Sequence, residues 1–123
     1  MAIEILKEIA SIVIEILKEI AAIVQGPQTG ALATIVKTKG STPRKAGAKM
    51  VVRPDGTAVG TICGGCVEAE VYAEAVLAMQ SGRCKLMTFH LTAEQAGELG
   101  MKCGGTMEVF IEPLFGTAAT APL

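Results

Sequence analysis

Aromatic side chains are scarce in this sequence. It has no tryptophan, one tyrosine and three phenylalanines among 123 residues, and its 11 Lys and Arg are balanced by 12 Asp and Glu. Proteins that bind nucleic acids normally present a basic face and aromatic side chains on which bases stack. The composition therefore argues against a nucleic-acid partner.

A basic leader and a long uncharged apolar run are also missing. The N-terminus is amphipathic and acidic, without the positive stretch and apolar core of a secretory signal. Six charged side chains within residues 3–24 argue against a membrane span. We therefore expect a cytoplasmic protein with no membrane span. In that reducing compartment its four cysteines are expected to be thiols, metal ligands or core residues, not disulfides.

The N-terminus contains a tandem repeat. IEILKEIASIV at residues 3–13 recurs as IEILKEIAAIV at residues 14–24, and only Ser11 differs, where the second block has Ala22. Eleven residues make close to three helical turns, so both blocks keep the same face. The polar side chains fall in a stripe roughly 120° wide. The remaining apolar surface is wider than one sheet face needs. We expect this helix to pack on its own sheet and on a partner subunit, as a homodimer or higher oligomer.

Apolar periodicity predicts an α/β fold: a single domain in which a mixed sheet of about five strands packs against helices and a long N-terminal helix. An Asp55-Gly56 pair between two apolar runs indicates a hairpin. The expected strands are 31–37, 49–53, 57–62, 84–91 and 106–113, and the later helices are 67–79 and 92–99. The expected organisation is a helix at 1–26, the α/β domain at 27–114 and a flexible tail at 115–123.

The segment Gly60–Glu70, GTICGGCVEAE, reads as a strand that ends in glycines and opens a helix. Free backbone N–H groups and the helix dipole favour an anion at such a point. The same field lowers the pKa of a thiol in the first helical turn, here Cys66. A second Cys-Gly-Gly turn begins at Cys103. Cys84, inside a strand, is expected to pack in the core, and His90 is expected at the surface.

Three chemistries compete for these cysteines. A structural zinc site needs four ligands, and no second Cys or His pair has suitable spacing. A thiol-disulfide redox protein could use Cys63 and Cys66 at the helix start, although the preceding elements do not follow the usual strand–helix opening. A site for an anionic cofactor could combine soft thiolates with glycine turns that bind phosphate. The residues leave the last two open.

Three segments, GSTPRKAGAKMVV, DGTAVGTICGGCVEAEV and KCGGTMEVFIEPL, together resemble the N-terminal domain of the XdhC/CoxI family, from about Ala31 to Leu114. That family comprises accessory factors of molybdenum hydroxylases such as xanthine dehydrogenase. The resemblance favours a chaperone over a turnover enzyme. Such a chaperone transiently binds the molybdenum cofactor in its molybdopterin form and protects it during sulfuration. The implied partners are the apo-enzyme, a sulfur-donating desulfurase and a separate protein with the family's Rossmann-type domain.

The resemblance also implies the site residues. Arg44 and the glycines would bind the cofactor, Cys66 would meet the molybdenum or its exchangeable sulfur, Cys103 would be a second thiol and Glu68 would position a proton. Cys63 is a second metal candidate, although the family usually has serine there. The matched cofactor-binding positions are Gly40, Ser41, Pro43, Arg44, Gly64, Gly65, Cys66, Cys103, Gly104, Gly105 and Thr106.

Overall fold

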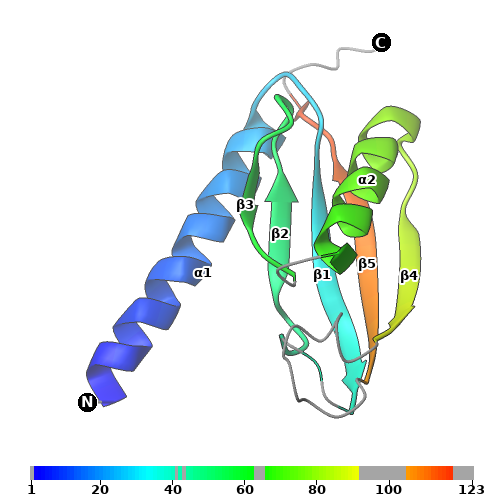
Figure 1. Cartoon of the computed structure of the whole chain (residues 1–123). Coiled ribbons are helices and arrows are strands. Elements are labelled where there is room, and N and C mark those ends of the chain that lie inside the picture. The colour runs from blue at the N-terminus through cyan, green and yellow to red at the C-terminus, as the bar shows by residue number, and fades with distance from the viewer. Residues whose placement is uncertain (1, 41, 43, 63–65, 92–104, 118–123) are drawn as a thin grey trace.

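The structure is a computed structural model that describes residues 2–40, 42, 44–62, 66–91 and 105–117, with the backbone alone at Ala2, Ile5, Glu8, Ile9 and Cys66. The described residues form two helices and five strands, and Figure 1 shows how they are arranged. The elements are α1 (Ala2–Gln25), β1 (Gly30–Lys39), β2 (Lys49–Val52), β3 (Ala58–Gly60), α2 (Cys66–Ser81), β4 (Lys85–His90) and β5 (Thr106–Leu114).

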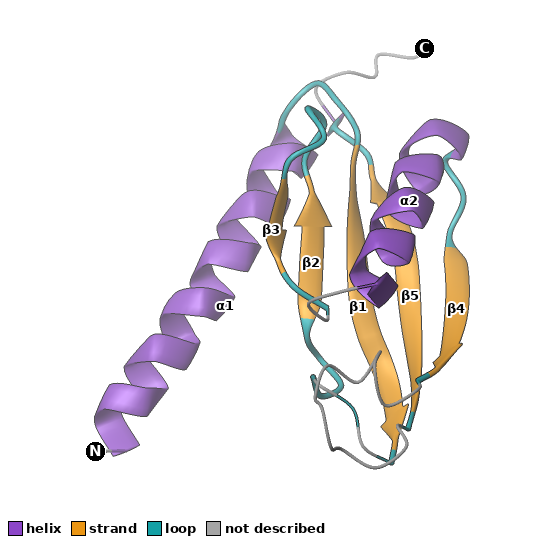
Figure 2. Ribbon diagram, viewed as in Figure 1, coloured by secondary structure: helices purple, strands orange, loops and turns teal. Residues whose placement is uncertain are grey.

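The five strands form one sheet in the order β3-β2-β1-β5-β4 (Figure 2). The α/β fold, the five strands and the packed helices confirm the prediction. Where the sequence suggested a mixed sheet, all four strand pairs are antiparallel. The reason lies in the connection from β3 to β4. Helix α2 runs back along the sheet before β4 starts, so β4 runs in the same direction as β1. Strand β5 runs in the opposite direction and pairs between these two strands.

The two helices cover opposite faces of the sheet. Side chains alternate between the faces along each strand, so Ala33 and Ile35 of β1 point toward α2 while Leu32 points toward α1. The larger core lies under α2, where Val67, Val71 and inward-facing side chains of the central strands such as Ile35 and Ile111 are fully buried. A smaller core under α1 is formed by Ile16, Ile23, Leu32 and Val51.

Among the described side chains of α1, those buried against the sheet belong to the C-terminal half of the helix. Ile16 and Ile23 are buried, whereas Ile3 and Leu6 are 63% and 62% exposed. In Figure 1 the N-terminal end of α1 extends away from the sheet. Arg53 fixes the anchored half, because its Nε and Nη2 each donate to a different oxygen of the Glu19 carboxylate at 2.9 Å. The hydrogen bond from Arg53 holds the pKa of Glu19 below its ordinary value.

Cys84 is exposed, so the expectation that it packs in the core is wrong. Along β4, Phe89 points toward α2 and is buried, whereas Leu86, on the opposite face, is 53% exposed. Cys84 immediately precedes this edge strand. Alternation identifies two faces of a strand, but it cannot tell which of them a helix will cover.

Two further expectations fall partly or wholly outside the described residues. The helix predicted at 92–99 lies entirely outside them, and the tail predicted at 115–123 lies outside them from residue 118 onward. Within the described part of the tail, Thr117 Oγ1 donates to the carbonyl oxygen of Val24 at 2.7 Å. No helix in the described part of the chain combines the length and apolarity that crossing a membrane requires.

Candidate functional site

The three segments that carry the resemblance converge at one end of the sheet. Antiparallel register pairs Lys39, at the end of β1, with Thr106, at the start of β5. The loop 40–48 therefore starts beside the segment that enters β5. The N-terminus of α2, where Cys66 is the first helical residue, faces the same end of the sheet (Figure 1). The helix start that the sequence predicted at Cys66 is thus confirmed.

Gly40 and Gly105 bring the first and third segments into backbone contact. A Cβ atom on Gly105 would lie 1.8 Å from the carbonyl oxygen of Lys39 and 2.8 Å from the carbonyl carbon of Gly40. Gly40 adopts a φ of 76°, which favours glycine. The Gly105 carbonyl also accepts the N–H of Leu91 at 2.9 Å. Both glycines are therefore required for the packing of the two segments, independently of any ligand.

The loop between β1 and β2 is held by hydrogen bonds at its base. The N–H of Ile35 donates to the carbonyl of Ala48 at 2.9 Å, and the N–H of Gly47 donates to the carbonyl of Ile35 at 2.7 Å. A bulge in β1 between Ile35 and Lys37 accompanies this pairing. Within the loop, Thr42 Oγ1 donates to the carbonyl of Arg44 at 2.9 Å. Arg44 thus lies in a turn that a hydrogen bond stabilises.

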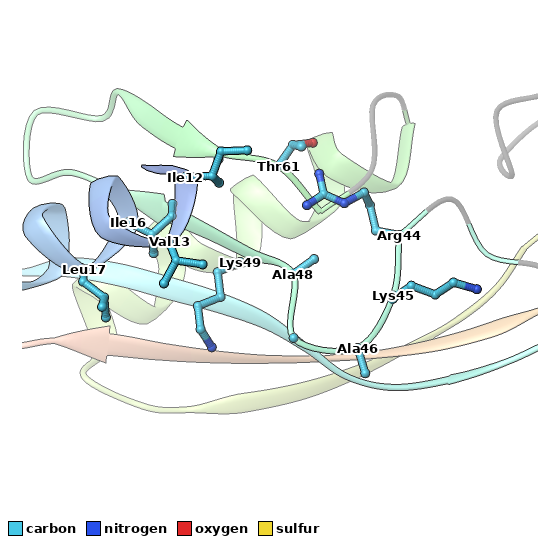
Figure 3. Close-up of a pocket in the computed structure, with 12 residues that line it drawn as sticks. Ile12, Val13, Ile16, Leu17, Arg44, Lys45, Ala46, Ala48, Lys49 and Thr61 are labelled. Carbon is cyan, nitrogen blue, oxygen red and sulfur yellow. The ribbon is translucent and has the colours of Figure 1, made fainter. Parts of the chain in front are cut away.

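A pocket of about 570 Å³ opens between this loop and α1. In Figure 3 the Arg44 guanidinium extends toward Thr61, while the Lys45 side chain points away from Thr61. Arg44 is half-buried and has no ion-pair partner among the residues that the structure describes. The residues that line the pocket are Ile12, Val13, Ile16, Leu17, Arg44, Lys45, Ala46, Gly47, Ala48, Lys49, Gly60 and Thr61.

The pocket has two chemically different walls. Four aliphatic side chains of α1 form one wall, and the other has three cationic side chains, Arg44 and Lys45 from the loop and Lys49 from the start of β2. Of these cations, Lys49 is engaged, because its Nζ lies 3.4 Å from Thr34 Oγ1. A planar guanidinium can bind two oxygens of a phosphate or carboxylate together. The arrangement therefore fits an anionic group that is attached to an apolar or flat body.

Glu68 connects the end of β3 to the first turn of α2. One carboxylate oxygen, Oε2, accepts the Thr61 hydroxyl and also the N–H of Ile62, the latter at 3.1 Å. A negative charge in the first helical turn is also favoured by the helix dipole. Glu68 thus holds a lining residue of the pocket in place, and this positional role stands beside the proton-handling role that the resemblance implies.

Replacing Glu68 with alanine should lower the free energy of unfolding by about 1–3 kcal/mol, the cost of a buried donor that loses its acceptor. Ile62 is fully buried, so water cannot readily replace the carboxylate at its N–H. Urea unfolding measures the difference, with Glu70→Ala as the control because Glu70 is exposed on the same helix. Equal stability of the two variants would contradict this role of Glu68.

Of the other predicted residues the structure describes Thr106 and His90, and it also shows contributions that the sequence did not predict. Thr106 is half-buried, and its Oγ1 lies 3.5 Å from Nδ1 of His90, which is exposed as expected. The wall from α1 and the contribution of Thr61 were missed, since nothing in the sequence relates the N-terminal helix to the loop. The predicted residues outside the described part of the chain are Ser41, Pro43, Cys63, Gly64, Gly65, Cys103 and Gly104.

Comparison with known proteins gives relatives that are much longer than this chain. The uncharacterized protein YqeB of Escherichia coli is 46% identical over 81 residues, which are 66% of this chain and 15% of YqeB. The molybdenum cofactor insertion chaperone PaoD of Escherichia coli is 36% identical over 83 residues, or 68% of this chain and 26% of PaoD. A probable xanthine dehydrogenase subunit of Bacillus subtilis is 31% identical over 91 residues, 72% of this chain and 28% of that protein.

A solved structure shares both the fold and the sequence pattern. The crystal structure of a xanthine dehydrogenase from Bacillus halodurans matches with a TM-score of 0.65 and 33% identity, over 81% of this chain and 30% of that one. The sequence model of the XdhC and CoxI family matches residues 23–90, which include the Arg44 loop and the start of α2. Since this match covers more than half of the chain, the protein belongs to the XdhC and CoxI family.

Proposed function

We propose that this chain binds the molybdenum cofactor as cargo and takes part in the maturation of a molybdenum hydroxylase. The similarity to PaoD, a molybdenum cofactor insertion chaperone, supports this role. The observation that carries the proposal is the pocket: a half-buried guanidinium without an ion-pair partner in the described residues faces an aliphatic wall, at the end of the sheet where the three family segments meet.

The pocket suits the chemistry of such a cargo. A pterin cofactor combines a flat ring system with a terminal phosphate. In the proposal Arg44 binds the phosphate with charge-assisted hydrogen bonds, and the N–H groups of Gly64 and Gly65 contribute at the helix start. The aliphatic side chains of α1 exclude water from one side of the ring system. Lys45, which is exposed, adds long-range attraction for the anion.

The finer steps are part of the same proposal. Cys66 meets the molybdenum or its exchangeable sulfur, since a thiolate is the soft ligand that this chain offers, and Cys103 supplies a second thiol. The protein then receives sulfur from a desulfurase and delivers the cofactor to the apo-enzyme. Residues 27–114 act as the cofactor-handling domain, to which α1 adds the aliphatic wall of the pocket, and a separate protein with a Rossmann-type domain completes the activity.

Replacing Arg44 with alanine should weaken cofactor binding about 10- to 150-fold, the effect of losing hydrogen bonds to a charged group worth roughly 1.5–3 kcal/mol. Pterin and molybdenum are measured on protein purified from cells that make the cofactor. Arg83→Ala is the matched control, since Arg83 is an exposed arginine beyond the far end of α2. Arg44→Lys keeps the charge but loses the planar fork, so its retention should lie between the two.

Two results would count against this function. One is the absence of pterin and molybdenum from the parent protein, and the other is equal retention by Arg44→Ala and Arg83→Ala. The redox alternative is tested on the same preparations. A reversible disulfide between Cys63 and Cys66 that reduces a disulfide substrate would favour a thiol exchanger.

A further inference from the structure

One face of α1 carries apolar residues at alternating spacings of three and four along the whole helix. We call this face the free seam. Its members are Ile3, Leu6, Ala10, Val13, Leu17, Ile20 and Val24. Leu6 is 62% exposed and Leu17 is 55% exposed. Strict three-four spacing over about three heptads is typical of a helix that packs against another helix. This spacing keeps the side chains that insert between those of the partner helix on one line.

The sheet of the same chain reaches the free seam only at its C-terminal end, where Ile20 packs against the smaller core under α1. On a helical projection the sheet-facing residues Ile16 and Ile23 lie roughly 100° from the centre of the seam. The charged stripe lies roughly 150° away on the other side. The helix thus has three separate stripes: one packs on its own sheet, one remains in water, and the free seam is apolar and exposed over most of its length.

We propose that the free seam packs against the free seam of a second copy of this chain, as an antiparallel helix pair centred on Val13. Such a pair places the unanchored half of one α1 over the sheet-anchored half of the other, and the reverse, so both seams are covered from end to end. The two sheets then lie at opposite ends of the pair. A parallel pair would bring both sheets to one end, where they compete for space.

The length and charge of the helix support this occupant. Residues 3–24 span about 33 Å at 1.5 Å per residue. In a two-fold pair both copies contribute the same residues to the contact. The two ends of the contact are therefore identical, and side chains that pack well at one end also pack well at the other. A lipid surface is disfavoured, because the helix carries four Glu and two Lys and anionic membranes attract basic helices.

The pairing would also complete the pocket. Val13 and Leu17 belong to the free seam and line the pocket as well, so a second helix on the seam closes the pocket along α1. This consequence rests on the proposed function only in so far as the pocket holds the cargo. The pairing itself does not depend on it, and its test uses no cofactor, so the two proposals can fail separately.

Sedimentation or light scattering of the whole protein at micromolar concentration tests the pairing. The parent protein should have the mass of a dimer. Leu6→Glu should halve that mass, because it buries a charge within the contact while touching no residue of its own sheet. Ser11→Glu is the matched control on the charged stripe of the same helix and should remain a dimer. Circular dichroism of each variant checks that the fold is kept.

A photo-crosslink tests the contact in protein in which every other residue of the free seam is unchanged. A p-benzoylphenylalanine placed at Ala10 should join two chains and map to α1 of the second chain, whereas the same group at Glu15 should not. A parent monomer at micromolar concentration overturns the proposal. So does a Leu6→Glu variant that stays dimeric, a Ser11→Glu variant that becomes monomeric, or a crosslink from Ala10 that maps outside α1 or to another protein.

Discussion

Replacing Gly105 with alanine is expected to lower the free energy of unfolding by about 3 kcal/mol or more, the upper range for a side chain forced into a packed site. The added methyl would lie 1.8 Å from the Lys39 carbonyl oxygen, far inside van der Waals contact. Its neighbours are backbone atoms of β1 and Gly40, which cannot move aside as the end of a flexible side chain can. To accommodate the methyl group, the backbone at residue 105 and the backbone at Lys39 and Gly40 must move apart.

The control for this substitution is Gly47→Ala. Gly47 lies in the same region and has a φ of 99°, but a Cβ there would meet no atom within 4 Å. Its cost should be limited to the left-handed backbone, about 1–2 kcal/mol. Urea unfolding at equilibrium compares the two variants with the parent. A loss for Gly105→Ala that does not exceed the loss for Gly47→Ala would show that the contact between the first and third segments is not tight.

The contact explains why two glycines can mark a functional site without touching its ligand. Gly105 lets the segment that enters β5 approach the end of β1, and Gly40 turns the chain from β1 into the Arg44 loop. From the sequence both were assigned to cofactor binding. The structure gives each a structural reason first, because a glycine required by a close backbone approach looks the same in a sequence as one required by a ligand.

Local signals accounted for most of the fold. The Asp55-Gly56 hairpin is present, with the N–H of Gly56 bonded to the carbonyl of Arg53 at 2.8 Å. Five segments, some continuously apolar and some alternating, became five strands, because both patterns report on burial in a sheet. The antiparallel order could not be predicted, since it depends on which strands meet across the sheet. The exposure of Cys84 was missed for the same reason: the coverage of a face is a tertiary property.

The candidate site was predictable only in part. The sequence placed Arg44 in a loop and Cys66 at a helix start, and both positions are confirmed. It did not place α1 against that loop, because β1 separates the two in the sequence and no local pattern joins them. The aliphatic wall of the pocket therefore appears only when the sheet positions both elements.

Replacing Cys66 with alanine is expected to remove molybdenum from the purified protein while leaving part of the pterin bound. The two losses separate because they depend on different groups. In the proposal the sulfur of Cys66 is the soft ligand for the metal. The proposed phosphate contact of Arg44 does not involve this sulfur. Arg44→Ala should therefore reduce both pterin and metal, and Cys66→Ala mainly the metal.

Cys84→Ala is the matched control, and its use follows from the structure. Because Cys84 is exposed, its replacement should change the free energy of unfolding by no more than about 0.5 kcal/mol, as is usual at the surface, and should leave the metal content unchanged. Elemental analysis for molybdenum and fluorescence of the oxidised pterin measure both quantities on each variant. Equal molybdenum in Cys66→Ala and the parent would remove the sulfur from the proposed chemistry and leave Arg44 and the pocket to account for any cofactor that is bound.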